Sequence, residues 1–172
     1  MKRQLIIVRH AKSERDDPTL DDFERPLSPR GLSEMPHVAK WLASQKLKID
    51  QIISSTAKRA RQTTELLCQG AGLDVKKIEW QDALYLADTA TLLNAIAHLP
   101  TTIKRLMIVG HNPGLEELLS HLCGDDLPRT KSGKLLTTAA IAIVVLPDGW
   151  DSIKPHTGQL IELMRPKELD RH

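Results

Sequence analysis

The chain has 172 residues, of which 41% are hydrophobic and only 3% are aromatic, so its core must consist mainly of Leu, Ile, Val and Ala. A chain of this length suits one domain that buries a sizeable core without disulfide bonds. The formal net charge of +2 is nearly balanced and gives no support for a nucleic acid or a membrane surface as a partner.

The first predicted element is a strand over residues 5–8, Leu-Ile-Ile-Val. An unbroken β-branched run is typical of a strand buried on both faces of a parallel sheet, although so short a run does not exclude a helix. The run stops at Arg9-His10, which a strand would deliver to the carboxyl edge of the sheet, where open α/β folds bind ligands. An imidazole can attack phosphorus, and a guanidinium can hold two phosphate oxygens. Taken alone, the pair is more simply the start of a solvated loop.

Residues 11–29 form a long polar segment with charges of both signs, and a connection of this length is usually functional or mobile. Whether it closes over a substrate is left open. A helix follows to about Gln45, with Ser28 as its N-cap and Pro29 at its first position. Its apolar face is expected to comprise Leu32, Met35, Val38, Ala39 and Leu42. Pro36 should kink the early turns, because it removes a backbone hydrogen bond.

Strands and helices then alternate. The predicted elements are a strand over 49–53, a helix over 57–69 stopped by the glycines at 70 and 72, a weaker strand over 75–80, a helix over 89–99, a strong strand over 106–109 and a helix to about Leu122. Asn112 is the expected N-cap of that last helix, with Pro113 at its first position. A β-rich run over 137–146 is expected to pair with 159–164 as a hairpin.

This alternation predicts a single α/β domain over residues 1–172. Its central sheet should be mostly parallel and flanked by helices on both faces, with late strands that are antiparallel.

Three of the predicted strands end in polar turns, namely Arg9-His10, residues 54–61 and Gly110-His111. In a parallel sheet these turns meet at one edge, which favours a functional site there. His111 lies at the start of a helix whose free N–H groups can bind an anion, although alone it could equally be a hydrogen-bonded histidine near a helix end. Lys58, Arg59 and Arg61 lie in or before the first turn of the helix predicted over 57–69, where cations oppose the helix dipole. A cation there makes sense if an anion faces it. For Lys58 and Arg61 a solvated basic face is the preferred interpretation.

A metal site is a weaker hypothesis. His111, His121 and Cys123 show no metalloprotease or zinc-finger spacing, and the turn at Gly110 lacks the end of a phosphate-binding P-loop. We therefore expect neither a metal nor another cofactor.

Together these residues resemble the histidine phosphatase superfamily, which includes phosphoglycerate-mutase-like enzymes. The resemblance rests on Arg9-His10-Ala11-Lys12-Ser13, on Ser55-Thr56-Ala57-Lys58-Arg59-Ala60-Arg61-Gln62-Thr63 and on Gly110-His111, in that order along the chain. Within the superfamily the chain is most similar to the SixA-type phosphohistidine phosphatases, because it is short and carries Arg25-Pro26-Leu27-Ser28 and a late strand over 136–142.

The resemblance implies a phosphoglycerate-mutase-like fold and assigns roles to five residues. His10 would be the nucleophile that forms a phosphohistidine intermediate, while Arg9, Arg59 and His111 would bind the phosphoryl oxygens. Arg25 matches an arginine near the pocket of SixA-type members. His10 must be neutral to attack and His111 serves best as a cation, so we expect the two environments to separate their protonation states.

The chain departs from the family pattern in two places. Ala11 replaces a glycine, with little expected effect. A glutamate that protonates the leaving group in many members has no clear counterpart; Asp82 is the nearest candidate and Asp88 the next, and both are more simply solvated loop residues.

We therefore expect a metal-free phosphatase that acts on a phosphohistidine-bearing protein, such as a phosphotransfer domain. The alternatives are a phosphatase for small phosphate monoesters and a phosphoprotein-binding module without turnover. Cys68 and Cys123 form no Cys-x-x-Cys pair, and the apolar run over 139–146 is too short to span a bilayer. These features predict a cytoplasmic protein, which we expect to be a monomer.

Overall fold

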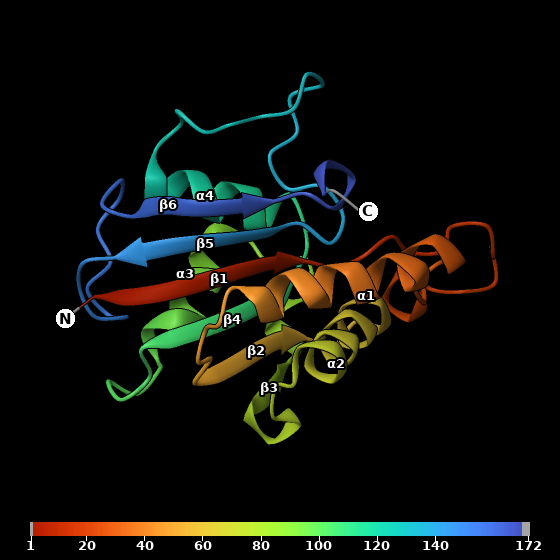
Figure 1. Ribbon diagram of the computed structural model, residues 1–172, viewed down its shortest axis with the longest axis horizontal. Coiled ribbons are helices and arrows are strands. Elements are labelled where there is room, and N and C mark those ends of the chain that lie inside the picture. Colours follow the sequence, from red (N-terminus) through yellow and green to blue (C-terminus); the bar gives the residue numbers. More distant parts are fainter. Residues whose placement is uncertain (1, 170–172) are drawn as a thin grey trace.

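The computed structural model describes residues 2–169, within which six strands form one sheet in the order β3-β2-β4-β1-β5-β6 (Figure 1). The strands are β1 (Arg3–Arg9), β2 (Gln51–Ser55), β3 (Ile78–Gln81), β4 (Arg105–Gly110), β5 (Ile141–Leu146) and β6 (Gln159–Met164). Strand β4 pairs in parallel with β1 and β2, and β2 pairs in parallel with β3. Strand β5 is antiparallel to β1 and to β6. The prediction of a mostly parallel sheet with antiparallel late strands is confirmed.

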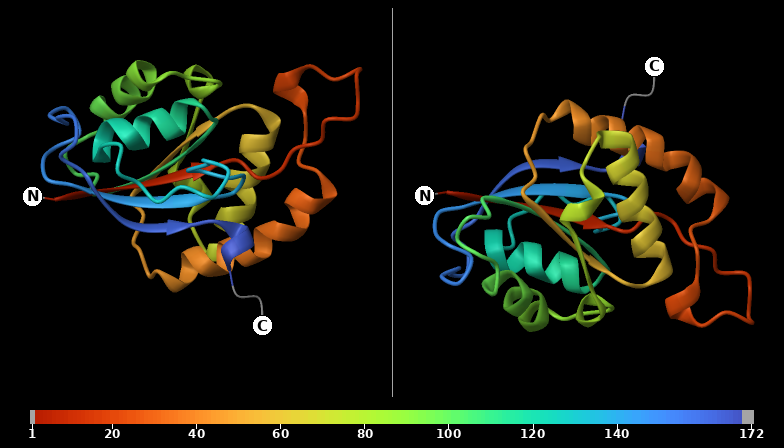
Figure 2. Two further views of the ribbon diagram at one scale, coloured as in Figure 1. Left: turned by 90° about the horizontal axis from the view of Figure 1, so that it is seen from above. Right: turned by 90° about the horizontal axis from the view of Figure 1, so that it is seen from below.

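Helices cover both faces of the sheet (Figure 2). The helices are α1 (Pro29–Ser44), α2 (Lys58–Ala71), α3 (Thr89–Ala97) and α4 (Gly114–Cys123). Helices α1 and α2 pack against one face and α3 and α4 against the other. The described residues also form four short 3-10 helices, which are η1 (Asp22–Glu24), η2 (Val75–Lys77), η3 (Asp82–Leu84) and η4 (Pro166–Glu168). No helix in residues 2–169 is both long enough and apolar enough to cross a membrane.

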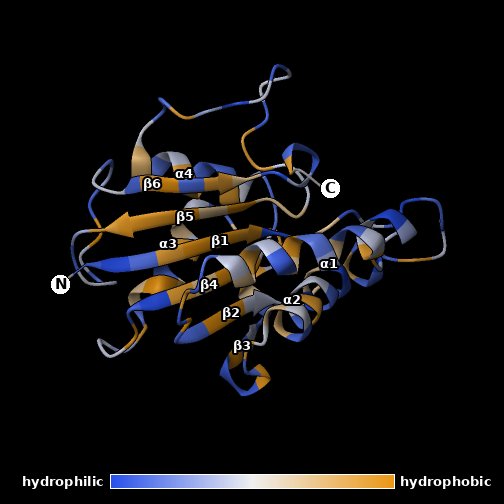
Figure 3. Cartoon of the chain, in the orientation of Figure 1, coloured by the Kyte–Doolittle hydropathy of each residue, from blue (hydrophilic) through white to orange (hydrophobic). Residues whose placement is uncertain are grey.

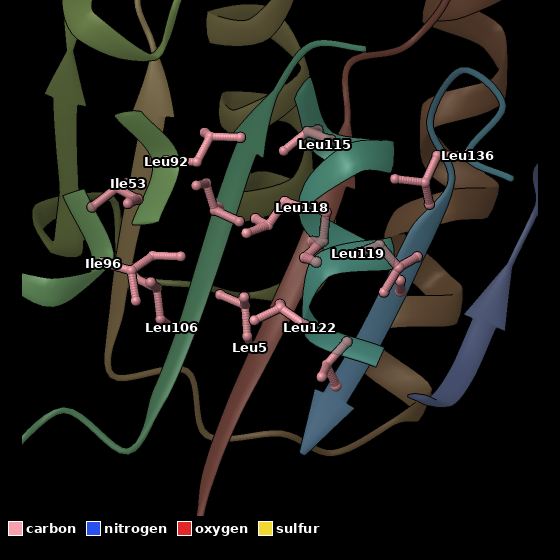
Figure 4. Packing of buried hydrophobic residues seen from close by; sticks show 14 of the residues in the cluster. Leu5, Ile53, Leu92, Ile96, Leu106, Leu115, Leu118, Leu119, Leu122 and Leu136 are labelled. Carbon is pink, nitrogen blue, oxygen red and sulfur yellow. The ribbon is translucent and has the colours of Figure 1, made fainter. Parts of the chain in front are cut away.

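Strand β1 lies between two hydrophobic cores, as an unbroken aliphatic run predicts. Leu5 and Ile7 pack with α3 and α4, where the leucines of α4 lie against the sheet (Figure 4). Ile6 and Val8 point to the opposite face and pack with α1 and α2. Burying each such side chain contributes about 1.5–3 kcal/mol relative to exposure. Figure 3 shows the same division: strand β5 is hydrophobic along its length, whereas the helices carry both hydrophobic and hydrophilic residues.

Helix α1 begins as predicted, with the Ser28 Oγ accepting a hydrogen bond from the Gly31 N–H at 3.1 Å and Pro29 at the first position. The helix runs on through Pro36 to Ser44, so no break occurs there. Pro36 removes one bond, to the carbonyl of Leu32. The prediction that Leu32 belongs to the apolar face is wrong, because this side chain is 44% exposed.

Three predicted boundaries are also wrong. Residues 75–77 form the turn η2, so the strand predicted over 75–80 begins only at Ile78. The strand predicted over 137–146 begins at Ile141, since Ala139 has a positive φ of 63° and its N–H donates to the carbonyl of His10. Helix α4 begins at Gly114, and the residue at its N-cap position is Pro113, which provides no side-chain cap. The Asn112 Nδ2 donates to the Leu136 carbonyl at 2.8 Å, and the Asn112 Oδ1 accepts no hydrogen bond within residues 2–169.

Candidate active site

Strands β1, β2 and β4 are neighbours and parallel, so their carboxyl ends meet at one edge of the sheet (Figure 1). A cleft of about 410 Å³ opens at that edge. All five residues that the sequence singled out line this cleft, namely Arg9, His10, Arg25, Arg59 and His111. Lys58 and Arg61 are exposed and lie outside the lining residues, in accordance with the preferred interpretation of a solvated face.

His10 follows directly after β1 and is buried, with 7% of its surface exposed. Its Nδ1 lies 2.7 Å from the carbonyl oxygen of Ala11. A carbonyl can only accept a hydrogen bond, so Nδ1 carries the proton and the neutral ring keeps its lone pair on Nε2. Burial lowers the pKa of His10 to about 3, and the nearby His111 and Arg59 act in the same direction. The side chain is therefore neutral near pH 7 and has a nucleophilic nitrogen.

The turn after His10 is tied to helix α2. The Ala11 N–H donates to the Thr63 hydroxyl at 3.0 Å, and that hydroxyl donates to the carbonyl of Arg59 at 2.8 Å. Ala11 is fully buried and packs in the core on the side of α1 and α2. This connection sets the distance between the end of β1 and the first turn of α2.

His111 follows β4, and its ring centroid lies 5.2 Å from that of His10. The His111 Nε2 is 2.8 Å from the Ser55 hydroxyl at the end of β2, while its buried Nδ1 has no partner within residues 2–169. Burial, followed by the charge of Arg59, lowers the pKa of His111 to about 4. With the charges that the chain itself supplies, both imidazoles are neutral near pH 7, so the expectation of a cationic His111 is wrong for this arrangement. An adjacent phosphoryl dianion would raise the pKa of His111.

Arg9 and Arg59 line the same cleft as the two histidines. The Arg9 Nη1 donates to the carbonyl of Leu136 at 3.0 Å. Within the described chain, the Nε atoms of both arginines are buried and have no hydrogen-bond partner. Unpartnered buried donors are costly. In the tautomer in which the Ser55 hydroxyl donates to the His111 Nε2, the His111 Nδ1 carries the proton and joins these arginines as a set of donors suited to an oxyanion.

A carboxylate that the sequence did not single out lies beside this donor set. Asp22, in the turn η1, accepts hydrogen bonds from Arg25 and Arg59 and from the hydroxyl of Tyr85. Burial alone would raise the pKa of Asp22, but the bonds from Tyr85, Arg25 and Arg59 outweigh it and hold the pKa well below its ordinary value. The ring of Tyr85 meets that of His111 edge-on at 5.4 Å.

The sequence distinguishes Tyr85 from its neighbours but does not distinguish Asp22. Asp22 is one of many charges in residues 11–29, and nothing in the sequence distinguishes it from the others. Tyr85 is the single tyrosine of the chain, and that was the one available signal.

The two sequence candidates for a proton donor do not line the cleft. Asp82 accepts a hydrogen bond from the Thr56 hydroxyl at 2.5 Å. Asp88 caps helix α3 by accepting from the Thr91 N–H at 2.9 Å, and hydrogen bonds from Thr91 lower the pKa of Asp88. Among the described residues, the carboxylates that line the cleft are Asp22 and the buried Glu34 of α1.

Comparison with known proteins matches this geometry to one family. A profile of the histidine phosphatase superfamily (branch 1) matches residues 5–82. The structure of a proposed phosphohistidine phosphatase SixA from Agrobacterium tumefaciens is 31% identical, with a TM-score of 0.80 over 95% of this chain and 98% of that one. The chain belongs to the histidine phosphatase superfamily. It is a phosphatase of the SixA-like type and has the phosphoglycerate-mutase-like fold that the family resemblance implied.

Two further relatives extend the similarity. The phosphohistidine phosphatase SixA of Escherichia coli is 29% identical over 147 residues, which cover 84% of this chain and 86% of the relative. A structure of the protein histidine phosphatase SixA in complex with tungstate has a TM-score of 0.80 at 27% identity, over 97% of this chain and 99% of that one. The match to the E. coli protein covers 84% of this chain, and the match to the tungstate complex covers 97%.

Proposed function

We propose that this phosphatase hydrolyses phosphohistidine on a phosphoprotein, such as a phosphotransfer domain, through a covalent intermediate on His10. One observation carries the proposal: the unprotonated Nε2 of a buried, neutral His10 shares a cleft with three buried donors that have no partner in residues 2–169. These donors are Arg9 Nε, Arg59 Nε and His111 Nδ1. A SixA relative was solved in complex with tungstate, a tetrahedral oxyanion, which supports an oxyanion as a ligand of this type of phosphatase.

In the first step the Nε2 lone pair of His10 attacks phosphorus, and the P–N bond of the substrate breaks with its electron pair passing to the substrate nitrogen. The developing charge on the phosphoryl oxygens is stabilised by Arg9, Arg59 and the His111 N–H. Water then attacks phosphorus, the P–N bond to His10 breaks, and both protons of the water leave with the phosphate. The His10 Nδ1–H remains hydrogen-bonded to the Ala11 carbonyl in both steps, which keeps the ring oriented.

The leaving group decides whether a proton donor is needed. When the ring of the substrate phosphohistidine is protonated, the leaving group is a neutral imidazole. Transfer of the phosphoryl group to His10 therefore requires no proton donor. An alkyl ester leaves as an alkoxide and needs general acid help, typically worth ~10²–10⁴-fold. Asp22 is held ionised by its hydrogen bonds, and Asp82 and Asp88 lie outside the cleft. Of the carboxylates that line the described cleft this leaves Glu34 of α1, whose part the Glu34→Gln variant tests. Without a proton donor there, the cleft suits phosphohistidine better than an alkyl phosphate.

The rim of the cleft suits a protein substrate. It carries a set of basic side chains, Lys12, Arg15, Arg30, Lys134 and Lys167. These cations form no ion pair with an acidic side chain within residues 2–169. Basic side chains around the site would attract the acidic surface of a phosphoprotein and raise the rate of encounter.

The proposal is tested by comparing kcat/KM for a phosphohistidine protein, an aryl phosphate and a glycerol phosphate. We expect the first two to be hydrolysed far faster than the third, and acid-labile phosphate to be trapped on wild type but not on His10→Ala. Asp82→Asn should leave phosphohistidine turnover within a few-fold of wild type, and so should Glu34→Gln.

Three results would contradict the proposal. Equal rates on aryl and alkyl phosphates, with the alkyl rate lost in Asp82→Asn or Glu34→Gln, would identify a proton donor and a small-molecule phosphatase. Phosphate binding without turnover of any of the three substrates would indicate a binding module. Turnover of phosphohistidine without phosphate trapped on His10 would exclude a covalent intermediate on that residue.

A further inference from the structure

Asp22 joins side chains from three separate parts of the chain. Its Oδ1 accepts from the Arg25 Nη2 at 2.6 Å and Nε at 3.1 Å, its Oδ2 accepts from the Arg59 Nη2 at 3.0 Å, and the Tyr85 hydroxyl donates to the same Oδ2. The backbone carbonyl of Asp22 also accepts from the Arg59 Nη1 at 2.6 Å. One residue of the long polar segment therefore contacts the guanidinium of Arg59 twice.

These two contacts use the terminal nitrogens of Arg59. A guanidinium is planar and presents five N–H donors in a rigid fork, so two bonds to one partner fix the plane of the group. The Arg59 side chain is 3% exposed, and its Nε–H has no partner within residues 2–169. The edge that carries Nε is thus left for another acceptor, while the terminal end is held by Asp22.

We propose that Asp22 is a positioning residue, which holds the Arg59 guanidinium so that its Nε edge meets a phosphoryl oxygen. The inference rests on the proposed function for the identity of the bound group. It assigns a task to residues 11–29 that neither the family resemblance nor the comparisons supply. Asp22 acts through Arg59 and has no part in the bond changes at phosphorus.

The geometry favours positioning over competition for the same site. An aspartate that occupied the place of the phosphoryl group would use up the donors intended for the substrate. Asp22 instead leaves Arg59 Nε, Arg9 Nε and His111 Nδ1 without a partner in the described chain. Tyr85 extends the same support, since it donates to Asp22 while its ring lies edge-on to His111.

Isothermal calorimetry with inorganic phosphate, combined with kcat/KM for an aryl phosphate, tests the role of Asp22 on the full chain. Asp22→Ala should weaken both phosphate binding and kcat/KM by roughly tenfold to a hundredfold, as expected when a binding group is misplaced by about 1 Å. Asp22→Asn keeps an oxygen acceptor and should restore part of the loss. In the Arg59→Ala background the Asp22→Ala change should have little further effect, because the two residues act together.

Asp21→Asn is the matched control, since Asp21 is exposed, lies one residue away and makes no side-chain cap bond to η1. It should behave as wild type. Asp22→Ser provides a second shortened variant, so that the result does not depend on the folding of Asp22→Ala, and circular dichroism monitors both.

Tighter phosphate binding on removal of Asp22 would show competition and overturn the inference. Equal losses from Asp22→Ala with and without Arg59, or no loss at all, would also overturn it. Phosphate binding is measured without turnover, so these results do not depend on which substrate the protein hydrolyses. A protein that shows the expected binding pattern but does not hydrolyse phosphohistidine would contradict the proposed function and leave the role of Asp22 intact.

Discussion

Acidification should destabilise this protein because it buries two neutral imidazoles. The pKa of His10 is lowered to about 3 and that of His111 to about 4, against 6.5 for an unperturbed histidine. Between these values and 6.5 the unfolded chain binds more protons than the native protein. Stability from these two groups is therefore fully present above about pH 6.5 and is lost as the pH falls towards 4 for His111 and 3 for His10.

The size of the effect follows from the width of this window. About pH 5 lies about 1.5 units below the pKa of a histidine in the unfolded chain, so such histidines are protonated. In the native protein His10 and His111 remain unprotonated at this pH. One unit corresponds to about 1.4 kcal/mol, so each histidine lowers the free energy of unfolding by ~2 kcal/mol relative to about pH 8. The two together account for ~4 kcal/mol, a large part of the stability of a typical domain.

Urea unfolding followed by circular dichroism at about pH 8 and about pH 5 measures this loss. His10→Asn removes one titrating group and keeps an N–H that can reach the Ala11 carbonyl, so it should lose ~2 kcal/mol less than wild type on acidification. The exposed His37 provides the control, because His37→Asn should lose as much as wild type. Equal losses in wild type and His10→Asn would show that native His10 titrates near its ordinary pKa, and would refute the argument for a neutral buried nucleophile.

Three further predictions concern single substitutions. His10→Ala should leave the circular dichroism spectrum unchanged and reduce turnover to background; retained turnover would exclude His10 as the nucleophile. Arg9→Ala should reduce kcat/KM about a hundredfold, or ~3 kcal/mol, through lost stabilisation of phosphoryl charge, and a change below about twofold would remove Arg9 from the site. Gly114→Ala should lower the melting temperature, since the new Cβ would lie 1.9 Å from the Ala87 carbonyl oxygen and would cost on the order of 1–3 kcal/mol; an unchanged melting temperature would mean that the two segments separate freely.

The sequence predicted the parts of this site that depend on local pattern. Apolar runs that stop at Arg9-His10 and at Gly110-His111 end two parallel strands, and parallel strands must present their carboxyl ends on the same edge. That rule alone brings His10 and His111 together, and the first turn of α2 adds Arg59. The strand boundary that failed at Ala139 lies where a distant bond overrides local preference, since the Ala139 N–H donates to the carbonyl of His10.

The strand segments and the burial of β1 on both faces could be predicted from the sequence, because hydrophobic patterns act over a few residues at a time. The order of the strands in the sheet was decided only by the tertiary structure. The tertiary structure alone decided that Asp22 meets Arg59 and Tyr85, residues 37 and 63 positions away along the chain. It also decided that both histidines are neutral, because the loss of hydration depends on everything packed around them. Charges that look alike in a polar segment acquire different roles only when the folded chain places one of them against a partner and leaves the others in water.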